Sequence, residues 1–570
     1  MTTQWNCSLA LLKTLEASGV EYIFGYPGGA AINLFDALPE TSIQLILSRH
    51  EQGAVHMADG YARAKNKLGV VLVTSGPGAL NTVTGIMTAQ MDSVPLLVIS
   101  GQTNSENLGK DAFQETDVYG VTMPLVKHSY LLLDETKVVE TTSEAMTIAM
   151  NGRPGAVVID IPKNISGRPY TGRFDRELKS RIHVTNPLIP HQDDIKRLST
   201  LFESSKRPLI LVGHGAILSR AFSEVKSLIT RLQAPLTNTL LGKGVFPESD
   251  PLNLGMLGMH GTATANYALT RCDLIVSFGS RFDDRISGDA KRFCSQAKIA
   301  HVDIDLGEIG KTVRTDLGIR GDIKETIRRL LPSLKPQNTS SWLAELADYR
   351  DDHPLYIRRN HLHAENVIEC MSRLTRGKAI VTTDVGQHQM WAALYYHVNA
   401  PDSWLSSGGA GTMGFGMPAA IGAQLAEPEK TVICICGDGG FQMTQSELAT
   451  AAIHKLPIKI VIIDNKCLGM VRQWQELFYD NRESGISLDG NPDFVKLAEA
   501  YGIKAFFIDS LDHCESEITK ALVYDDGPCL IHVEVERDEN VFPMIPAGKS
   551  AEDIILQQPE EGLEKPHGST

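Results

Sequence analysis

The chain has 570 residues, 42% of them hydrophobic and 21% charged, so it can bury several cores and should hold about three or four domains. Its net charge of -14 is spread along the chain, and the absence of a basic run argues against a nucleic-acid partner. No apolar run approaches the ~18 residues of a membrane helix, and nine scattered cysteines without a CxxC pair fit a reducing compartment, so we expect a cytoplasmic protein without a membrane partner.

Short β-branched runs alternate along the chain with helical patterns, which is typical of parallel sheets covered by helices on both faces. Most of these runs end in Gly, Asp or Asn, residues that allow tight turns at the carboxyl edge of a sheet, where ligands of α/β folds bind. Polar connections near 168–194 and 332–341 divide the chain. We therefore predict three α/β domains at 1–170, 190–335 and 360–540, followed by a polar tail at 541–570. The amphipathic start, which lacks a signal-peptide pattern, is predicted to be mature protein. The runs are VVLVTSG, PLLVISG, AVVIDIP, LILVGHG, DLIVSFG, AIVTTDVG, TVICICGDG and IKIVIIDN.

In the first domain, IQLILS is predicted to be a strand, and RHEQGAVHMADGYAR continues into a helix that Glu51 opens. Two interpretations of Glu51 compete with a catalytic one. An acid in a first helical turn interacts favourably with the helix dipole. His50, Glu51 and His56 could also suggest zinc, but histidines six residues apart do not share one helix face as those of HExxH do.

The third domain contains GDGGFQM at 437–443, directly after the apolar run TVICIC, and the next strand ends in Asn465. One βαβ unit would bring Asp438 and Asn465 to neighbouring strand ends. Two hard oxygen ligands there suit Mg²⁺, which completes its coordination with water and substrate phosphate oxygens. The glycines and the helix start that follows suit a diphosphate. The alternative is a turn aspartate with an unrelated asparagine.

This GDG to Asn spacing resembles the thiamine diphosphate signature of the decarboxylase and carboligase superfamily. FGYPGGA, RHEQGA, TSGPGALN, DAFQE, GRPGAVVIDIPK, RFDDRISG, GQHQMWAA, GTMGFGMPAAIGA and GMVRQWQ narrow the resemblance to the large catalytic subunits of acetohydroxyacid synthase, also called acetolactate synthase. It extends from about Gly19 to the end of the third domain. It implies three doubly wound α/β domains with mainly parallel six-stranded sheets, which bind the pyrimidine, FAD and the diphosphate in chain order.

The resemblance also implies roles for individual residues. Glu51 would hydrogen-bond the cofactor pyrimidine, and Gln114, Lys163, Arg285 and Trp474 would line the substrate pocket. The Mg²⁺ ligands would be Asp438, Asn465 and the carbonyl of Cys467. Thiamine diphosphate contacts would come from Gly29, Gln387, His388, Gly411, Met413, Gly437, Gly439 and Met443, with Met413 holding the cofactor bent. GAGTMG at 409–414 is accordingly interpreted as lining the thiazolium rather than as a dinucleotide site.

The middle domain would bind FAD through Arg153, Gly213, Gly215, Met259, His260, Gly279, Arg281, Asp303 and Asp322. One departure from the family is His214, which stands between Gly213 and Gly215 where relatives have alanine. A histidine there could crowd the flavin nucleotide or hydrogen-bond it. Two other roles stay open: Arg285 could pair with Asp283 or Asp284 instead of a substrate carboxylate, and Trp474 could be a packing tryptophan.

The implied reaction is the decarboxylation of pyruvate on thiamine diphosphate and ligation of the hydroxyethyl carbanion to a second 2-ketoacid, pyruvate or 2-ketobutyrate. This is the first common step of valine, leucine and isoleucine biosynthesis. The resemblance also implies a homodimer or homotetramer and a possible small regulatory subunit. The alternatives are a simple 2-ketoacid decarboxylase, although the chain has no His-His pair; glyoxylate carboligase, which lacks the pyrimidine glutamate; and a non-catalytic paralogue, which should have lost Glu51, Asp438 or Asn465.

Overall fold

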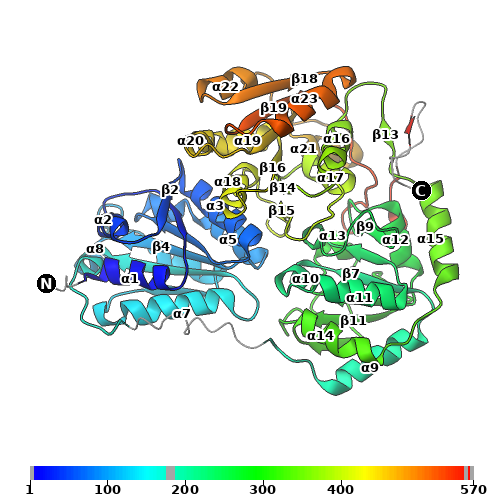
Figure 1. Cartoon of the computed structure of the whole chain (residues 1–570), viewed down its shortest axis with the longest axis horizontal. Helices are drawn as coiled ribbons and strands as arrows, with labels where there is room; N and C mark the ends of the chain where they lie inside the picture. The colour runs from blue at the N-terminus through cyan, green and yellow to red at the C-terminus, as the bar shows by residue number, and fades with distance from the viewer. Residues whose placement is uncertain (1–4, 175–186, 557–562, 565–570) are drawn as a thin grey trace.

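The protein is described from a computed structural model that covers residues 5–174, 187–556 and 563–564. These residues form three successive α/β units, each built on a six-stranded sheet in which every strand pair is parallel (Figure 1). The predicted fold class is thereby confirmed. Parts of the predicted connection at 168–194 and of the predicted tail lie outside the described residues.

The N-terminal unit has the strand order β2-β1-β3-β4-β6-β5. Its strands are β1 (Tyr22–Gly25), β2 (Gln44–Leu47), β3 (Gly69–Val73), β4 (Leu96–Gln102), β5 (His128–Leu131) and β6 (Ala156–Pro162). Its helices are α1 (Cys7–Ala17), α2 (Ile32–Ala37), α3 (Glu51–Lys65), α4 (Pro77–Leu80), α5 (Val83–Met91), α6 (Val118–Thr122), α7 (Val138–Met150) and α8 (Lys163–Ser166).

The middle unit has the order β12-β11-β10-β7-β8-β9. Its strands are β7 (Pro208–Val212), β8 (Leu236–Asn238), β9 (Asn253–Met256), β10 (Leu274–Phe278), β11 (Lys298–Asp303) and β12 (Leu317–Arg320). Its helices are α9 (Gln192–Ser204), α10 (His214–Leu218), α11 (Phe222–Leu232), α12 (Ala263–Arg271), α13 (Asp284–Ser287), α14 (Ile323–Leu330) and α15 (Ser340–Asp352).

The C-terminal unit has the order β15-β14-β16-β17-β19-β18. Its strands are β14 (Ile380–Thr383), β15 (Trp404–Ser406), β16 (Val432–Gly437), β17 (Lys459–Asp464), β18 (Lys504–Ile508) and β19 (Cys529–Glu534). Its helices are α16 (Ala364–Thr375), α17 (Gln387–Tyr395), α18 (Gly416–Ala426), α19 (Asp438–Thr444), α20 (Leu448–Ile453), α21 (Gly469–Phe478), α22 (Phe494–Ala500) and α23 (Leu511–Val523). A small antiparallel pair joins β13 (Ile357–Arg358) to β20 (Leu563–Glu564).

Alternating side chains explain why the central strands read as continuous apolar runs. In β3, Val71 and Val73 enter one core while Val70 and Leu72 enter another on the opposite face of the sheet. The strands of the middle and C-terminal units divide their side chains between two cores in the same way. A parallel sheet that is buried on both faces requires apolar side chains on both sides of each strand.

The N-terminal and C-terminal units share one of these cores through the packing of α3 against α18, which lie side by side in Figure 1. A Cβ atom on Gly60 of α3 would come within 2.1 Å of the Ala419 carbonyl oxygen. A Cβ on Gly422 of α18 would come within 1.9 Å of the Met57 carbonyl oxygen. The two helices can approach this closely only because both positions are glycine.

The segment after β19 folds back onto the molecule. Val541 and Met544 are fully buried, and the Ile545 amide donates to the Met259 carbonyl of the middle unit at 2.8 Å. The Val541 amide donates to Gln473 Oε1 of α21 at 2.9 Å. Residues 541–556 therefore connect α21 to the middle unit. Within the described ranges, no helix combines the length and apolar character needed to cross a membrane.

Candidate active site

Two carboxylates meet at the carboxyl edge of the C-terminal sheet. Gly437 pairs with Ile463 in the register of β16 and β17, so Asp438 at the start of α19 reaches the same edge as Asp464 at the end of β17. Asn491 Nδ2 donates to Asp438 Oδ2 at 2.7 Å and to Asp464 Oδ1 at 3.2 Å. Burial, together with the neighbouring Asp464 carboxylate, raises the pKa of Asp438.

This donor set suits a hard divalent cation. A cation bound to Asp438 would let its carboxylate stay ionised where burial and the Asp464 carboxylate otherwise disfavour its charge. Asn465 is the next residue in the chain and is 7% exposed. Among the described residues, its Oδ1 accepts one hydrogen bond, from the Cys467 amide at 3.3 Å. Asp464 is also oriented by His532 Nε2, 2.9 Å from its Oδ2.

Two glycines let His388 and Gln387 pack closely beside these ligands. A Cβ on Gly437 would lie 2.7 Å from His388 Nδ1, and one on Gly469 would lie 2.0 Å from Gln387 Oε1. Burial lowers the pKa of His388 to about 3, and its Nε2 has no hydrogen-bond partner among the described residues. The Gln387 amide nitrogen donates to Gln473 Oε1 at 2.9 Å and to the Glu539 carbonyl at 2.7 Å. Gln387 is thus a fixed part of the wall, whereas His388 retains a free nitrogen.

Asp384, which follows β14, holds the 408–414 loop. Both of its carboxylate oxygens accept from the Gly414 amide, at 2.9 and 3.0 Å, and burial raises its pKa to about 6. Met413 stands next in this loop, and its methyl group would lie 3.7 Å from a Cβ built on Gly439. Met443, by contrast, is 59% exposed.

Glu51 lies at the carboxyl edge of the N-terminal sheet as the first residue of α3, where the sequence predicts it. It is 8% exposed, and its Oε2 accepts from Asn81 Nδ2 at 2.9 Å. The amides of Arg49 and His50, just before Glu51, both donate to Glu447 of the C-terminal unit at 3.0 Å. Histidine 56 faces Phe415 instead of joining His50, and burial lowers its pKa to about 3.

Other predicted pocket residues follow neighbouring strands of this sheet. Gln114 has a φ of +55°, and its carbonyl lies 2.8 Å from a Cβ built on Gly76. Lys163 begins α8 directly after β6 and is exposed, and Gly29 has open space around it. Phe113, beside Gln114, is 89% exposed.

A cleft of about 950 Å³ lies where the middle unit meets the other two. It is lined by most of the residues predicted for FAD and by four predicted around the reaction centre, but not by Glu51, Gln114 or Lys163. The predicted residues that line it are Arg153, Gly215, Met259, His260, Gly279, Arg281, Asp303, Asp322, Gly411, Met413, Arg285 and Trp474.

A glycine turn forms the cleft floor at the start of α10. A Cβ on Gly213 would meet the Gly279 carbonyl oxygen at 2.3 Å, and one on Gly215 would meet the Gly279 Cα at 2.8 Å. His214 also lines the cleft, and its Nδ1 lies 2.7 Å from the Asp92 carbonyl of the N-terminal unit. Burial lowers the pKa of His214 to about 4, with Arg63 acting in the same direction.

Several polar side chains line the same cleft. His260 Nδ1 has no hydrogen-bond partner among the described residues, and burial lowers the pKa of His260 to about 4. Burial raises the pKa of Asp303, at the end of β11, to about 6 and also raises that of Asp322. Arg153 is paired with Glu308 at 2.8 Å and with Asp305 at 3.2 Å.

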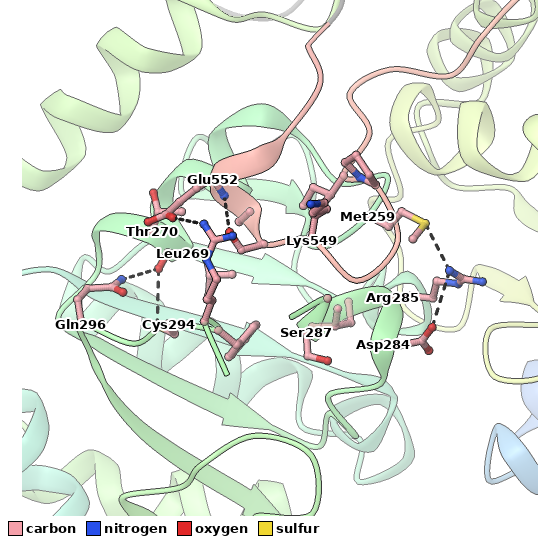
Figure 2. A pocket seen from close by; sticks show the side chains of 18 residues that line it. Met259, Leu269, Thr270, Asp284, Arg285, Ser287, Cys294, Gln296, Lys549 and Glu552 are labelled. Carbon is pink, nitrogen blue, oxygen red and sulfur yellow. Dashed lines mark hydrogen bonds and ion pairs between the residues drawn. The ribbon is translucent and has the colours of Figure 1, made fainter. Parts of the chain in front are cut away.

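Arg285 lies at the cleft mouth next to Trp474. Its guanidinium carbon is 5.9 Å from the Trp474 ring centre. Its Nη1 is 3.5 Å from Met259 Sδ, and Figure 2 shows this contact. The contact with Asp284 is loose, at 3.8 Å between exposed side chains. Figure 2 also shows Lys549 and Glu552 of the returning C-terminal segment, which line another pocket together with Arg285 and Met259. Arg285 is therefore only weakly engaged and remains available to a ligand carboxylate.

The sequence analysis did not identify several residues that position side chains at the carboxyl edges of the N-terminal and C-terminal sheets. Asp464 directly precedes the predicted ligand Asn465, so its position at a strand end was a usable signal. Asn81, Asp384, Glu447 and Asn491 act across long sequence separations and carry no local pattern.

Comparison with known proteins covers nearly the whole chain. The family profile "Thiamine pyrophosphate enzyme, N-terminal TPP binding domain" matches residues 6–121, the central-domain profile matches 195–330, and the C-terminal TPP binding domain profile matches 384–533. The chain is 44% identical over 568 residues to an acetolactate synthase large subunit of Porphyra purpurea, covering 97% of this chain and 96% of the relative. Proteins of the same name from Haemophilus influenzae and Lactococcus lactis subsp. lactis are 42% and 44% identical, covering 97% and 96% of this chain and 98% and 96% of theirs.

Proposed function

Because the chain belongs to the acetolactate synthase large subunits of the thiamine pyrophosphate enzymes, we infer that it condenses pyruvate with a second 2-ketoacid. It forms acetolactate from two pyruvates, the first common step of branched-chain amino-acid biosynthesis. The observation that supports this function most directly is the buried pair of Asp438 and Asp464 at adjacent strand ends, where glycines let His388 and Gln387 pack closely beside them.

Asp438, Asn465 and the Cys467 carbonyl would hold Mg²⁺, with Asp464 behind them. The carboxylate and amide oxygens are hard donors. The pKa of Asp438 is raised, and a bound cation would favour the ionised form of its carboxyl group. The free Nε2 of His388 would meet a diphosphate oxygen through a shared proton or water. Bound thiamine diphosphate would supply a carbanion centre and an electron sink for the decarboxylation of a 2-ketoacid.

Glu51 would hydrogen-bond the pyrimidine ring of the cofactor. Its position is fixed by Asn81 and, through the preceding amides, by Glu447. A carboxyl group that is 8% exposed forms a stronger bond to a ring nitrogen than one in water would. The same site would exclude water, and with it the proton donors that would release acetaldehyde instead of a ligated product.

The cleft at the middle unit would hold FAD. Its volume of about 950 Å³, its glycine turn at Gly213, Gly215 and Gly279, and the unpaired His260 Nδ1 fit a long, polar-ended cofactor. Asp303 ends β11 and Asp322 follows β12, at the edge where a doubly wound sheet binds a nucleotide. Arg285 would bind the acceptor carboxylate, and Trp474 beside it would contact the acceptor alkyl group.

The complete catalytic site would form between two chains. Glu51, Gln114 and Lys163 do not line the cleft that Arg285, Trp474 and Met413 share. Both regions carry exposed apolar side chains, Phe113 at 89% near Gln114 and Met443 at 59% near the metal ligands. Such side chains fit burial in an isologous dimer, which a tetramer would repeat.

A small regulatory subunit is part of this proposal only through the words "large subunit" in the relatives' names. The nine buried free cysteines support a cytoplasmic location.

The test is a direct assay of purified protein with thiamine diphosphate, Mg²⁺, FAD and pyruvate, measuring acetolactate and acetaldehyde separately. Acetolactate as the main product, with dependence on Mg²⁺, is expected. Acetaldehyde as the main product would favour a simple decarboxylase. No consumption of pyruvate by folded, cofactor-saturated protein would favour a non-catalytic paralogue. Omission of FAD, with flavin absorbance of the purified protein as a second measurement, tests the flavin separately.

A further inference from the structure

Two histidines and a glutamate meet outside the cleft, at the start of α16. His361 and His363 stand two residues apart before that helix, and Glu539 follows β19. One ligand atom from each residue lies within 4.8 Å of the other two. His363 and Glu539 are buried, whereas the His361 side chain is 43% exposed. The proposed reaction uses none of these three side chains.

Both ring nitrogens of His363 face oxygen atoms. Nε2 lies 2.8 Å from Asn360 Oδ1, and Nδ1 lies 2.5 Å from Glu539 Oε1. In a neutral ring that donates Nε2–H to Asn360, Nδ1 carries a lone pair directed at a carboxylate oxygen. Two lone pairs cannot face each other at this distance without a cation between them. In that tautomer, the cation between Nδ1 and Oε1 is a second proton or a metal ion.

Hydrogen bonds from neighbouring residues orient His363 and Glu539, as such bonds usually orient metal ligands. Asn360 Oδ1 would hold the distal N–H of a coordinating histidine, as oxygen acceptors do behind most metal-bound imidazoles. Arg358 binds Glu539 Oε2 at 3.1 Å and also binds both oxygens of Glu365, at 2.8 and 3.1 Å. The Glu539 carboxylate is thus held by one oxygen, and its Oε1 remains directed at the two imidazoles.

His361 completes the arrangement from the solvent side. Its Nε2 is 3.6 Å from Glu539 Oε1, and its ring centre is 3.9 Å from that of His363. Ligands of a tetrahedral zinc ion stand ~3.3 Å apart, since each bond is about 2.0 to 2.1 Å. The exposed His361 side chain can close its distance to Glu539 at little cost. The buried His363 and Glu539 would have to separate by about 0.8 Å to accommodate the ion.

We propose that His361, His363 and Glu539 form a second metal site, which binds a divalent transition metal such as Zn²⁺ with water in the fourth position. Two imidazoles with one carboxylate suit Zn²⁺ and do not suit Mg²⁺, which prefers oxygen ligands. Binding replaces the proton between His363 Nδ1 and Glu539 Oε1, so that proton is released to solvent. The site is separate from the Asp438 site in both position and ligand chemistry.

The experiment is a calorimetric Zn²⁺ titration of the full chain, saturated with Mg²⁺ and thiamine diphosphate so that the Asp438 site is occupied. One equivalent should bind with proton release, detected as a binding enthalpy that changes with the ionisation enthalpy of the buffer. Co²⁺ in place of Zn²⁺ should give the intense visible absorption of four-coordinate cobalt.

Variants identify the ligands. His361→Ala, at a half-exposed position that should fold normally, should weaken Zn²⁺ binding by at least ~10-fold. The matched control His191→Ala removes an exposed histidine elsewhere and should bind as the wild type does. Asp438→Ala, titrated without cofactor, should keep the site even if the proposed function fails. No binding by the wild type, equal affinity in His361→Ala, or equal losses in both histidine variants would overturn the proposal.

Discussion

Asp438 illustrates how a residue can be costly to the fold and necessary to the site. Its raised pKa means that burial and Asp464 disfavour its charge, so the protein without cation gains nothing from ionising it at neutral pH. Asp438→Ala should therefore abolish Mg²⁺-dependent binding of thiamine diphosphate while leaving the melting temperature of the cofactor-free protein unchanged or higher. Fluorescence titration and calorimetry measure the two effects. Asp489→Ala, an exposed acid nearby, is the control. A lowered melting temperature with intact binding would contradict the assignment.

Trp474 tests the acceptor pocket at the same scale. Its ring faces Arg285 and lines the cleft, so its apolar surface would contact the extra methylene of 2-ketobutyrate. One methylene is worth ~1 to 3 kcal/mol in an apolar pocket, which corresponds to about tenfold or more in acceptor preference. Trp474→Leu should keep acetolactate formation and lose most of this preference when both acceptors compete. Phe478→Leu, one turn along α21 and outside the cleft lining, should keep it. An unchanged product ratio in Trp474→Leu would make Trp474 a packing residue.

Helix α3 is the element that positions the proposed acid. Glu447 accepts the two amides before Glu51 and is fully buried, so the C-terminal unit ties down the start of a helix that belongs to the N-terminal unit. Glu447→Ala would leave both amides without an acceptor, at a cost of about 2 kcal/mol or more in the free energy of unfolding. It should also lower kcat by displacing Glu51, with little change in Mg²⁺ affinity.

Denaturant unfolding and Mg²⁺ titration of the activity separate these effects. Glu447→Gln, which keeps one acceptor oxygen, should recover most of the rate. Loss of stability with an unchanged kcat would limit Glu447 to a structural role.

At the scale of elements, most of the fold could be predicted, because each central strand is an apolar β-branched run that ends in a turn residue. The run TVICIC became β16, and IKIVIIDN became β17 followed by Asn465. The start of α3 at Glu51 was also predictable from its first-turn acid. The contacts of Glu447, Asn81 and Asn491 could not be predicted, because each depends on how separate elements dock. The exposure of Phe113 likewise has no signal in a single sequence.

For the whole molecule, the separation of Glu51 from the cleft predicts complementation between inactive variants. If each site takes Glu51 from one chain and Asp438 from its partner, a mixed dimer of Glu51→Gln and Asp438→Ala chains contains one intact site and one doubly defective site. Random mixing by co-expression should then restore about a quarter of the wild-type activity per chain. Each variant expressed alone is the control. If both residues came from the same chain, co-expression would restore nothing.

Buried neutral histidines predict that the whole protein is sensitive to acid. Burial lowers the pKa values of His56, His214 and His301 to about 3 to 4, whereas an unfolded histidine titrates near 6.5. Below pH ~6.5 the unfolded chain binds more protons than the folded protein, so the free energy of unfolding falls with pH by up to about 1.4 kcal/mol per unit for each histidine. Denaturant midpoints between pH 7 and 5 measure this slope. His56→Gln should flatten it and the exposed His513→Gln should not; equal slopes would contradict this account.

The contact between α3 and α18 also affects how the protein is made. Roughly 350 residues separate the two helices in the chain, and Gly60 and Gly422 let them pack backbone to backbone only after both have been synthesised. At ~5 to 20 residues per second, α3 leaves the ribosome between about 20 and 70 seconds before its partner exists. During that time its small-residue face is uncovered while the middle unit is being translated. A chaperone would therefore be most useful after α3 has been synthesised and before α18 covers its exposed face.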